Sequence, residues 1–160
     1  MVGFIHLNCK TSFSLLEGMV HPEDLAKEAG KRNLPALGIC ELGNVFSAVD
    51  ISKEFPKKEN GVQPILGAEL PVLSLPTGQL GERPTIGYLP LLVQNDTGWK
   101  NLTRLISLAN MRKHTEGDAG VALADVLPRT EGLICLSGAY GRGWASLGQH
   151  QGRLEAFLTP

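Results

Sequence analysis

Polar side chains that could do chemistry follow three apolar runs of this sequence. Asn8 and Lys10 follow the first run, Glu41 follows the second with the aliphatic Leu42 after it, and Glu69 closes the third. In βα proteins the chemistry lies at the carboxyl ends of the strands, and a metal site there would need His and carboxylate ligands. A charged Lys has three donors and no lone pair, so it cannot be a ligand. The pattern indicates the position of a metal centre from which most ligands are missing.

Two carboxylates and one imidazole remain as weak candidate ligands. Glu41 and Glu69 could bind a hard or borderline cation. His6 shares a strand face with Asn8 and Lys10 by alternation, although a lone His beside an apolar run is more often structural. Two carboxylates near Lys10 favour an ion-pair network over a metal site.

A glycine-rich turn over residues 137–143 is a second candidate site. Its glycines, Gly138, Gly141 and Gly143, could present backbone N–H groups to a phosphate before a helix. The turn fits neither the Walker pattern nor G-x-G-x-x-G. An ordinary strand-to-helix turn is therefore the interpretation that we favour.

The composition is that of one globular domain. The chain has 160 residues, of which 42% are apolar and 19% charged, with a net charge of −1. This balance argues against a basic nucleic-acid surface, so we expect weak or no direct DNA binding. No apolar run approaches the roughly 20 residues of a membrane span, and no signal segment opens the chain, so we expect no membrane contact and a cytoplasmic protein. The odd set of three cysteines predicts reduced, buried thiols.

Apolar runs alternate with helical patterns along the chain, which predicts an α/β protein with about five parallel strands and helical connections. We expect the long helix to be capped by Asp96 or Thr97, and Pro90 suggests an edge or irregular position for its strand. The expected strands are 4–7, 36–40, 62–73, 88–93 and 132–136, and the expected helices are 21–33, 45–55, 96–112, 122–127 and 144–158.

Six segments in order resemble one family, the N-terminal PHP (polymerase and histidinol phosphatase) domain of the alpha subunit of bacterial DNA polymerase III. They share its motifs and its spacing from residue 4 to about 140. The segments are Phe4–Leu7 with Ser14–Gly18, Leu34–Leu37, Gly43–Val49, Gln63–Glu69, Leu91–Leu102 and Glu131–Gly138.

The resemblance implies a barrel of seven βα units, with a metal cluster at the strand ends in active members. It implies a parent chain that is a DNA-directed DNA polymerase, a nucleotidyltransferase of DNA replication. It also implies partners: the remainder of the polymerase alpha chain and the separate proofreading exonuclease subunit.

The departures from the family pattern lie at the metal ligands. Asn8 and Lys10 stand where metal-binding members have a His-x-His pair, and Glu41 and Leu42 stand where they have Asp-His. Glu69 matches the family glutamate. The resemblance therefore implies a degenerate metal site, for which we expect no catalytic residue and no cofactor, with weakly bound Mn or Zn as the alternative.

Tyr88 stands where a family His usually opens the fourth strand, which removes another ligand. If the rim forms as in the family, Lys10 lies between Glu41 and Glu69, and its ammonium neutralises carboxylates that a metal once neutralised. We hypothesise that a fixed cation has replaced a bound one.

A closed βα barrel takes about 250 residues, so five strands cannot close one. We therefore expect residues 1–160 to be a single, partial PHP domain, the N-terminal portion of a longer polymerase chain, whose open edge could self-associate. The expected role is structural and protein-binding. One alternative is a residual metal-dependent 3′–5′ exonuclease or phosphoesterase using His6, Glu41 and Glu69, and another is binding of a small phosphorylated ligand at Gly138–Gly143.

Overall fold

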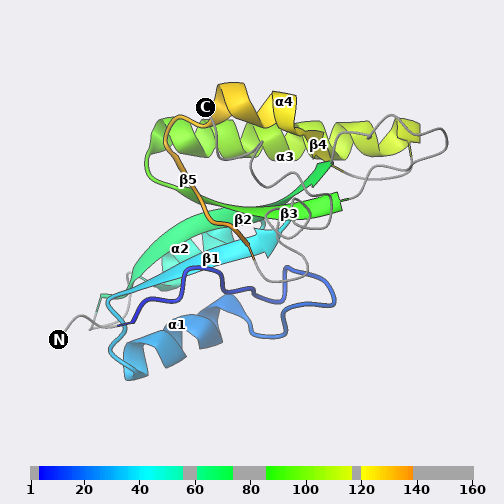
Figure 1. The fold of residues 1–160 in the computed structure, drawn as a ribbon. Helices are drawn as coiled ribbons and strands as arrows, with labels where there is room; N and C mark the ends of the chain where they lie inside the picture. Colours follow the sequence, from blue (N-terminus) through cyan, green and yellow to red (C-terminus); the bar gives the residue numbers. More distant parts are fainter. Residues whose placement is uncertain (1–3, 56–60, 74–85, 117–119, 139–160) are drawn as a thin grey trace.

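The computed structural model describes residues 4–55, 61–73, 86–116 and 120–138, with the side chains of 112–116 left aside (Figure 1). The predicted helix 144–158 lies wholly outside these residues. The elements in chain order are α1 (Pro22–Lys31), β1 (Ala36–Leu42), α2 (Ala48–Glu54), β2 (Gln63–Leu73), β3 (Ile86–Val93), α3 (Asp96–Glu116), β4 (Val121–Ala122), α4 (Leu123–Val126), the 3-10 turn η1 (Leu127–Arg129) and β5 (Leu133–Cys135).

The five strands form one mixed sheet in the order β1-β2-β3-β5, with β4 paired to the end of β2 beyond β1. The α/β class is confirmed. β1 and β4 run parallel to β2, but β3 is antiparallel to both β2 and β5. The expectation that all five strands are parallel was therefore wrong for β3. A parallel crossover needs a dozen or more residues, usually with a helix, and the Gly- and Pro-rich segment before β3 has no helical pattern.

β3 is also not an edge strand, although Pro90 suggested one. It lies between β2 and β5, with Pro90 in register with Glu69. The carbonyl of Pro90 accepts a hydrogen bond from the backbone N–H of Leu136 at 2.9 Å. Proline lacks only a donor, so its carbonyl can still hold a neighbouring segment.

The first apolar segment runs alongside β1 without forming the strand predicted over 4–7. Its one ladder contact is an isolated parallel bridge between Cys9 and Ile39. Gly38 donates to the His6 carbonyl at 2.7 Å, and Cys9 donates to the Gly38 carbonyl at 3.0 Å. A Cβ on Gly38 would lie 2.5 Å from the Leu7 carbonyl oxygen, so glycine is required for this close approach.

The helices begin largely where the sequence predicts. α1 starts at Pro22, with acidic residues in its first turn that favour the helix dipole. The cap of α3 is Asn95, because its side-chain oxygen accepts the backbone N–H of Gly98 at 3.0 Å. The predicted caps Asp96 and Thr97 were therefore wrong by one or two residues.

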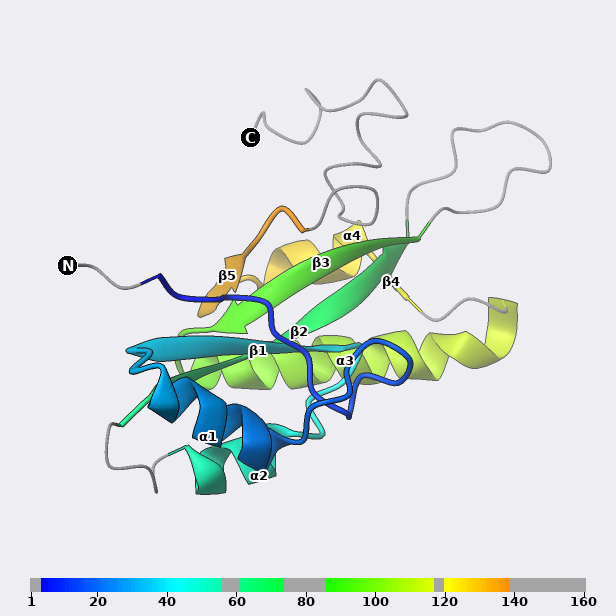
Figure 2. The ribbon, with the colours of Figure 1, turned by 90° about the horizontal axis from the view of Figure 1, so that it is seen from below.

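By register, the helices pack on one face of the sheet. Because the sheet is twisted, α1 lies below β1 and α3 lies above β2 and β3 in the view of Figure 1, and Figure 2 shows the same elements from below. Side chains alternate between the faces of a strand, and the register places Ile39 beside Leu66 and Glu41 beside Ala68. One buried cluster joins β1 to α1 and α2, and a second joins β2 and β3 to α3 and α4. The opposite face carries Cys40, Leu42 and Glu69, and it is this face that forms the candidate site.

Candidate site on the helix-free face of the sheet

A buried ion pair joins Lys10 to Glu69 near the carboxyl end of β1. The Lys10 Nζ lies 2.8 Å from Glu69 Oε2, and the two side chains are 17% and 4% exposed. Asn8 Nδ2 donates to the other carboxylate oxygen at 3.3 Å. Within the described part of the chain, no further polar group reaches Oε2. Asn8 and Lys10, the two residues expected at the positions of a His-x-His pair, therefore both contact Glu69.

Lys10 also reaches a second carboxylate. Its Nζ lies 3.6 Å from Glu17 Oε2. Glu17 belongs to a loop closed by hydrogen bonds from Ser12 N to the Val20 carbonyl and from Gly18 N to the Ser14 carbonyl. The ammonium thus links this loop to β2. Sequence reasoning did not identify Glu17, because its proximity depends on how the loop closes.

Glu41 lies on the other face of the sheet, in register with Ala68 rather than Glu69. It is 1% exposed. Its carboxylate accepts hydrogen bonds from the Thr11 hydroxyl at 2.5 Å, from the Thr11 backbone N–H at 3.2 Å and from the Ser14 hydroxyl. The hypothesis that Lys10 lies between two carboxylates was therefore right for Glu69 and wrong for Glu41.

Ser14 completes the hydrogen bonding around Glu41. Its Oγ accepts the backbone N–H of Leu42 at 2.9 Å while donating to Glu41. Asn44 Nδ2, in the segment after β1, donates to the Phe13 carbonyl at 3.1 Å. This bond joins that segment to the loop that carries Thr11 and Ser14. The Thr-Ser-Phe-Ser run was the sequence signal for these hydroxyl groups, but nothing in its spacing paired them with Glu41.

The remaining candidate ligands do not converge. His6 is exposed, and its ring contacts Phe4 edge-to-face at 4.7 Å between centroids. By register, Tyr88 and Leu42 lie on the same face as Glu69 and are half-buried. In the ranges that the structure describes, no three His, Cys, Asp or Glu side chains are grouped as a metal centre requires.

Cys40 is a buried thiol on the Glu69 face. Burial, followed by the nearby Glu69 carboxylate, raises the pKa of Cys40 from its ordinary 9.0 to about 12. A thiol with so high a pKa is protonated at neutral pH and is a poor nucleophile. Desolvation also raises the pKa of Cys9 and Cys135. Cys9 is half-buried and Cys135 is exposed, so the prediction of buried thiols is confirmed for Cys40 alone.

The donor set does not fit a divalent cation. Glu69 already contacts an ammonium and an amide, and Glu41 accepts hydroxyl and backbone donors on the opposite face. A cation at Glu69 would have to displace Lys10 and would find an amide as its neighbouring ligand. Of the glycines proposed for phosphate, Gly138 has a positive φ of 83°, while Gly141 and Gly143 lie outside the described residues.

Comparison with known proteins gives the family. The PHP domain model matches residues 6–159, and the chain belongs to the PHP domain family. The chain is similar to the DNA polymerase III subunit alpha of Caulobacter vibrioides, with 37% identity over 139 residues that cover 85% of this chain and 12% of that protein. It is 33% identical to the Pseudomonas aeruginosa subunit alpha over 98% of this chain and 13% of that protein. An error-prone DNA polymerase of Symbiobacterium thermophilum is 34% identical over 86% of this chain and 13% of its own length.

The chain thus spans about an eighth of the length of these relatives. A solved structure of a proposed metal-dependent phosphoesterase from Bifidobacterium adolescentis gives a TM-score of 0.47 at 14% identity, covering 68% of this chain and 34% of that one. That likeness is too slight to place any residue. None of the helices described is long and apolar enough to cross a membrane.

Proposed function

We propose that this chain is a non-catalytic PHP module of a replicative DNA polymerase, the alpha subunit of DNA polymerase III. The observation that carries the proposal is the 2.8 Å contact between Lys10 Nζ and Glu69 Oε2 on the helix-free face of the sheet. A buried carboxylate needs a compensating charge or hydrogen bonds. Here a covalently attached ammonium supplies that charge, and Asn8 supplies a hydrogen bond.

The alternative of residual hydrolysis needs His6, Glu41 and Glu69 to act together. Glu41 and Glu69 project from opposite faces of the sheet, and His6 is exposed beside Phe4. This separation favours the non-catalytic role. The family match and the names of the relatives support the assignment to replication.

A protein-binding role is supported by the loop that Lys10 and Glu41 hold. The loop exposes Leu15, Leu16 and Met19, and the last two side chains are 105% and 92% exposed. Leu16 has a positive φ of 65°, which is costly for a non-glycine residue. Exposed apolar side chains on an ordered loop are typical of a contact surface. The proposed partners are the remainder of the polymerase chain and the proofreading exonuclease subunit.

Hydrolysis assays test the non-catalytic assignment directly. The 160-residue chain would be incubated with Mn²⁺ or Zn²⁺ and either an aryl phosphate ester or a 3′-labelled oligonucleotide. We expect no turnover above that of buffer with metal. Turnover that disappears in Glu69→Gln would show that the site is catalytic and would overturn the proposal.

A further inference from the structure

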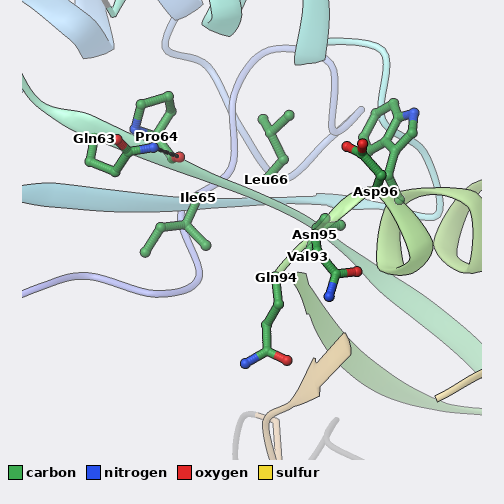
Figure 3. Close-up of a pocket in the computed structure, with 9 residues that line it drawn as sticks. Gln63, Pro64, Ile65, Leu66, Val93, Gln94, Asn95 and Asp96 are labelled. Atoms are coloured by element: carbon green, nitrogen blue, oxygen red, sulfur yellow. Dashed lines mark hydrogen bonds between the residues drawn. The ribbon is translucent and has the colours of Figure 1, made fainter. Parts of the chain in front are cut away.

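A groove lies where β2 and β3 diverge, and neither Lys10 nor Glu69 is among its lining residues (Figure 3). The last register pair between the two strands is Gly67 with Leu92. On the amino-terminal side of that pair, β2 remains paired with β1, while the chain after Val93 turns into α3. The space between them is about 410 Å³, within the range of ligand-binding clefts.

The charge of this groove is negative. Asp96 lines it, together with the amides of Gln94 and Asn95, and no Lys or Arg is among its lining residues. Asp96 takes part in none of the ion pairs found in the described ranges. It lies in the first turn of α3, where the helix dipole offsets part of its charge. The carboxylate of Asp96 is exposed, and no cationic side chain lines the groove to pair with it.

An aromatic ring stands beside this carboxylate. Trp99 also lines the groove and follows Asp96 by three residues, so the two side chains share one face of α3. A carboxylate next to an indole binds cations through charge and through the ring face. Arginine suits both groups best, because its planar guanidinium stacks on aromatic rings and pairs with carboxylates through two hydrogen bonds.

The groove also borders the part of β2 that precedes its pairing with β3. Gln63 donates its backbone N–H to the Pro35 carbonyl on the β1 side. Because backbone groups alternate between the two edges of a strand, the carbonyl of Pro64 points to the β3 edge of β2, beyond the last register pair. An extended segment could pair there while its side chain enters the groove.

We infer that this groove binds an arginine side chain of an extended segment of a partner protein. The inference is independent of the proposed function, because it uses none of the residues around Glu69. A single anchored side chain predicts a weak complex, with a Kd on the order of 1 mM for a short peptide.

The test is a titration of the ¹⁵N-labelled chain with acetyl-Gly-Arg-Gly-amide, followed by NMR. We expect saturable shifts of the Trp99 indole N–H and of the Gly67 and Gln94 amides. The matched peptide acetyl-Gly-Gln-Gly-amide should give none. Asp96→Asn should weaken binding by about fivefold or more, equivalent to roughly 1 kcal/mol.

Asp50→Asn is the matched control, because Asp50 is an exposed first-turn aspartate of a different helix. It should leave the arginine titration unchanged. Equal shifts with the glutamine peptide, an unaltered affinity in Asp96→Asn, or no saturable shift at 20-fold the expected Kd would each overturn the inference. Saturable shifts of the same resonances on addition of a single-stranded oligonucleotide would also overturn the inference, because they would indicate a nucleic-acid site.

Discussion

Replacing Lys10 by methionine removes the charge opposite Glu69 while keeping most of the side-chain volume. Glu69 is 4% exposed and would keep only the 3.3 Å hydrogen bond from Asn8. Removing one partner of a buried ion pair costs about 3–5 kcal/mol. Because Lys10 retains 17% exposure, water can partly replace it, so we expect the lower end of that range, about 3 kcal/mol.

Urea unfolding followed by circular dichroism measures this cost, provided that the m-value is unchanged. Glu69→Gln should cost less, about 1 kcal/mol, since the partly exposed ammonium keeps Glu17 nearby. The double variant should be more stable than Lys10→Met alone, because no buried charge is left unpaired. Lys27→Met, which removes an exposed lysine of α1 paired with Glu23, is the control and should leave the midpoint nearly unchanged. A Lys10→Met variant as stable as the wild type, or a double variant that loses the sum of both single losses, would refute the charge compensation.

Three further predictions concern the groups around this site. Ser14→Ala should cost about 2–3 kcal/mol by urea unfolding, because it leaves the Leu42 N–H without a partner and leaves Glu41 Oε2 with only the 3.2 Å bond from the Thr11 N–H; Ser52→Ala, which removes an exposed hydroxyl of α2, should cost far less, and equal costs would contradict the account. The pKa of Cys40 is about 12 in the folded protein, so the unfolded state loses this proton at lower pH. Between pH 9 and 12 the free energy of unfolding should therefore fall more steeply in the wild type than in Cys40→Ala, by about 1.4 kcal/mol per pH unit. Equal slopes in the two proteins would show that the thiol is not buried. Gly38→Ala should cost about 1–3 kcal/mol and expose residues 6–9 to proteolysis, since its Cβ would overlap the Leu7 backbone; wild-type protease resistance would show that the segment does not lie against β1.

The sequence was sufficient for the parts of the fold that depend on local pattern. The helix predicted over 21–33 is α1, which begins at Pro22, and the helix predicted from residue 96 is α3. The family spacing led to the prediction that Lys10 lies beside Glu69. These features need only periodicity, capping chemistry or motif order.

The parts that could not be predicted depend on long-range pairing. The direction of β3 depends on whether its connection from β2 contains a crossover helix, and the alternation of apolar runs alone does not tell parallel from antiparallel neighbours. The separation of Glu41 from Glu69 follows from a one-residue difference in register between β1 and β2, which places them on opposite faces. The pairing of Thr11 and Ser14 with Glu41 requires the loop to close first.

The central claim is that an ammonium has taken the place of a divalent cation at Glu69. Equilibrium dialysis against micromolar Mn²⁺ and Zn²⁺, followed by elemental analysis, tests it in the wild type and in Glu69→Gln. We expect less than about a tenth of an equivalent of either metal, and the same amount in both proteins, because Lys10 occupies the carboxylate. A full equivalent of metal in the wild type that is lost in Glu69→Gln would contradict the account.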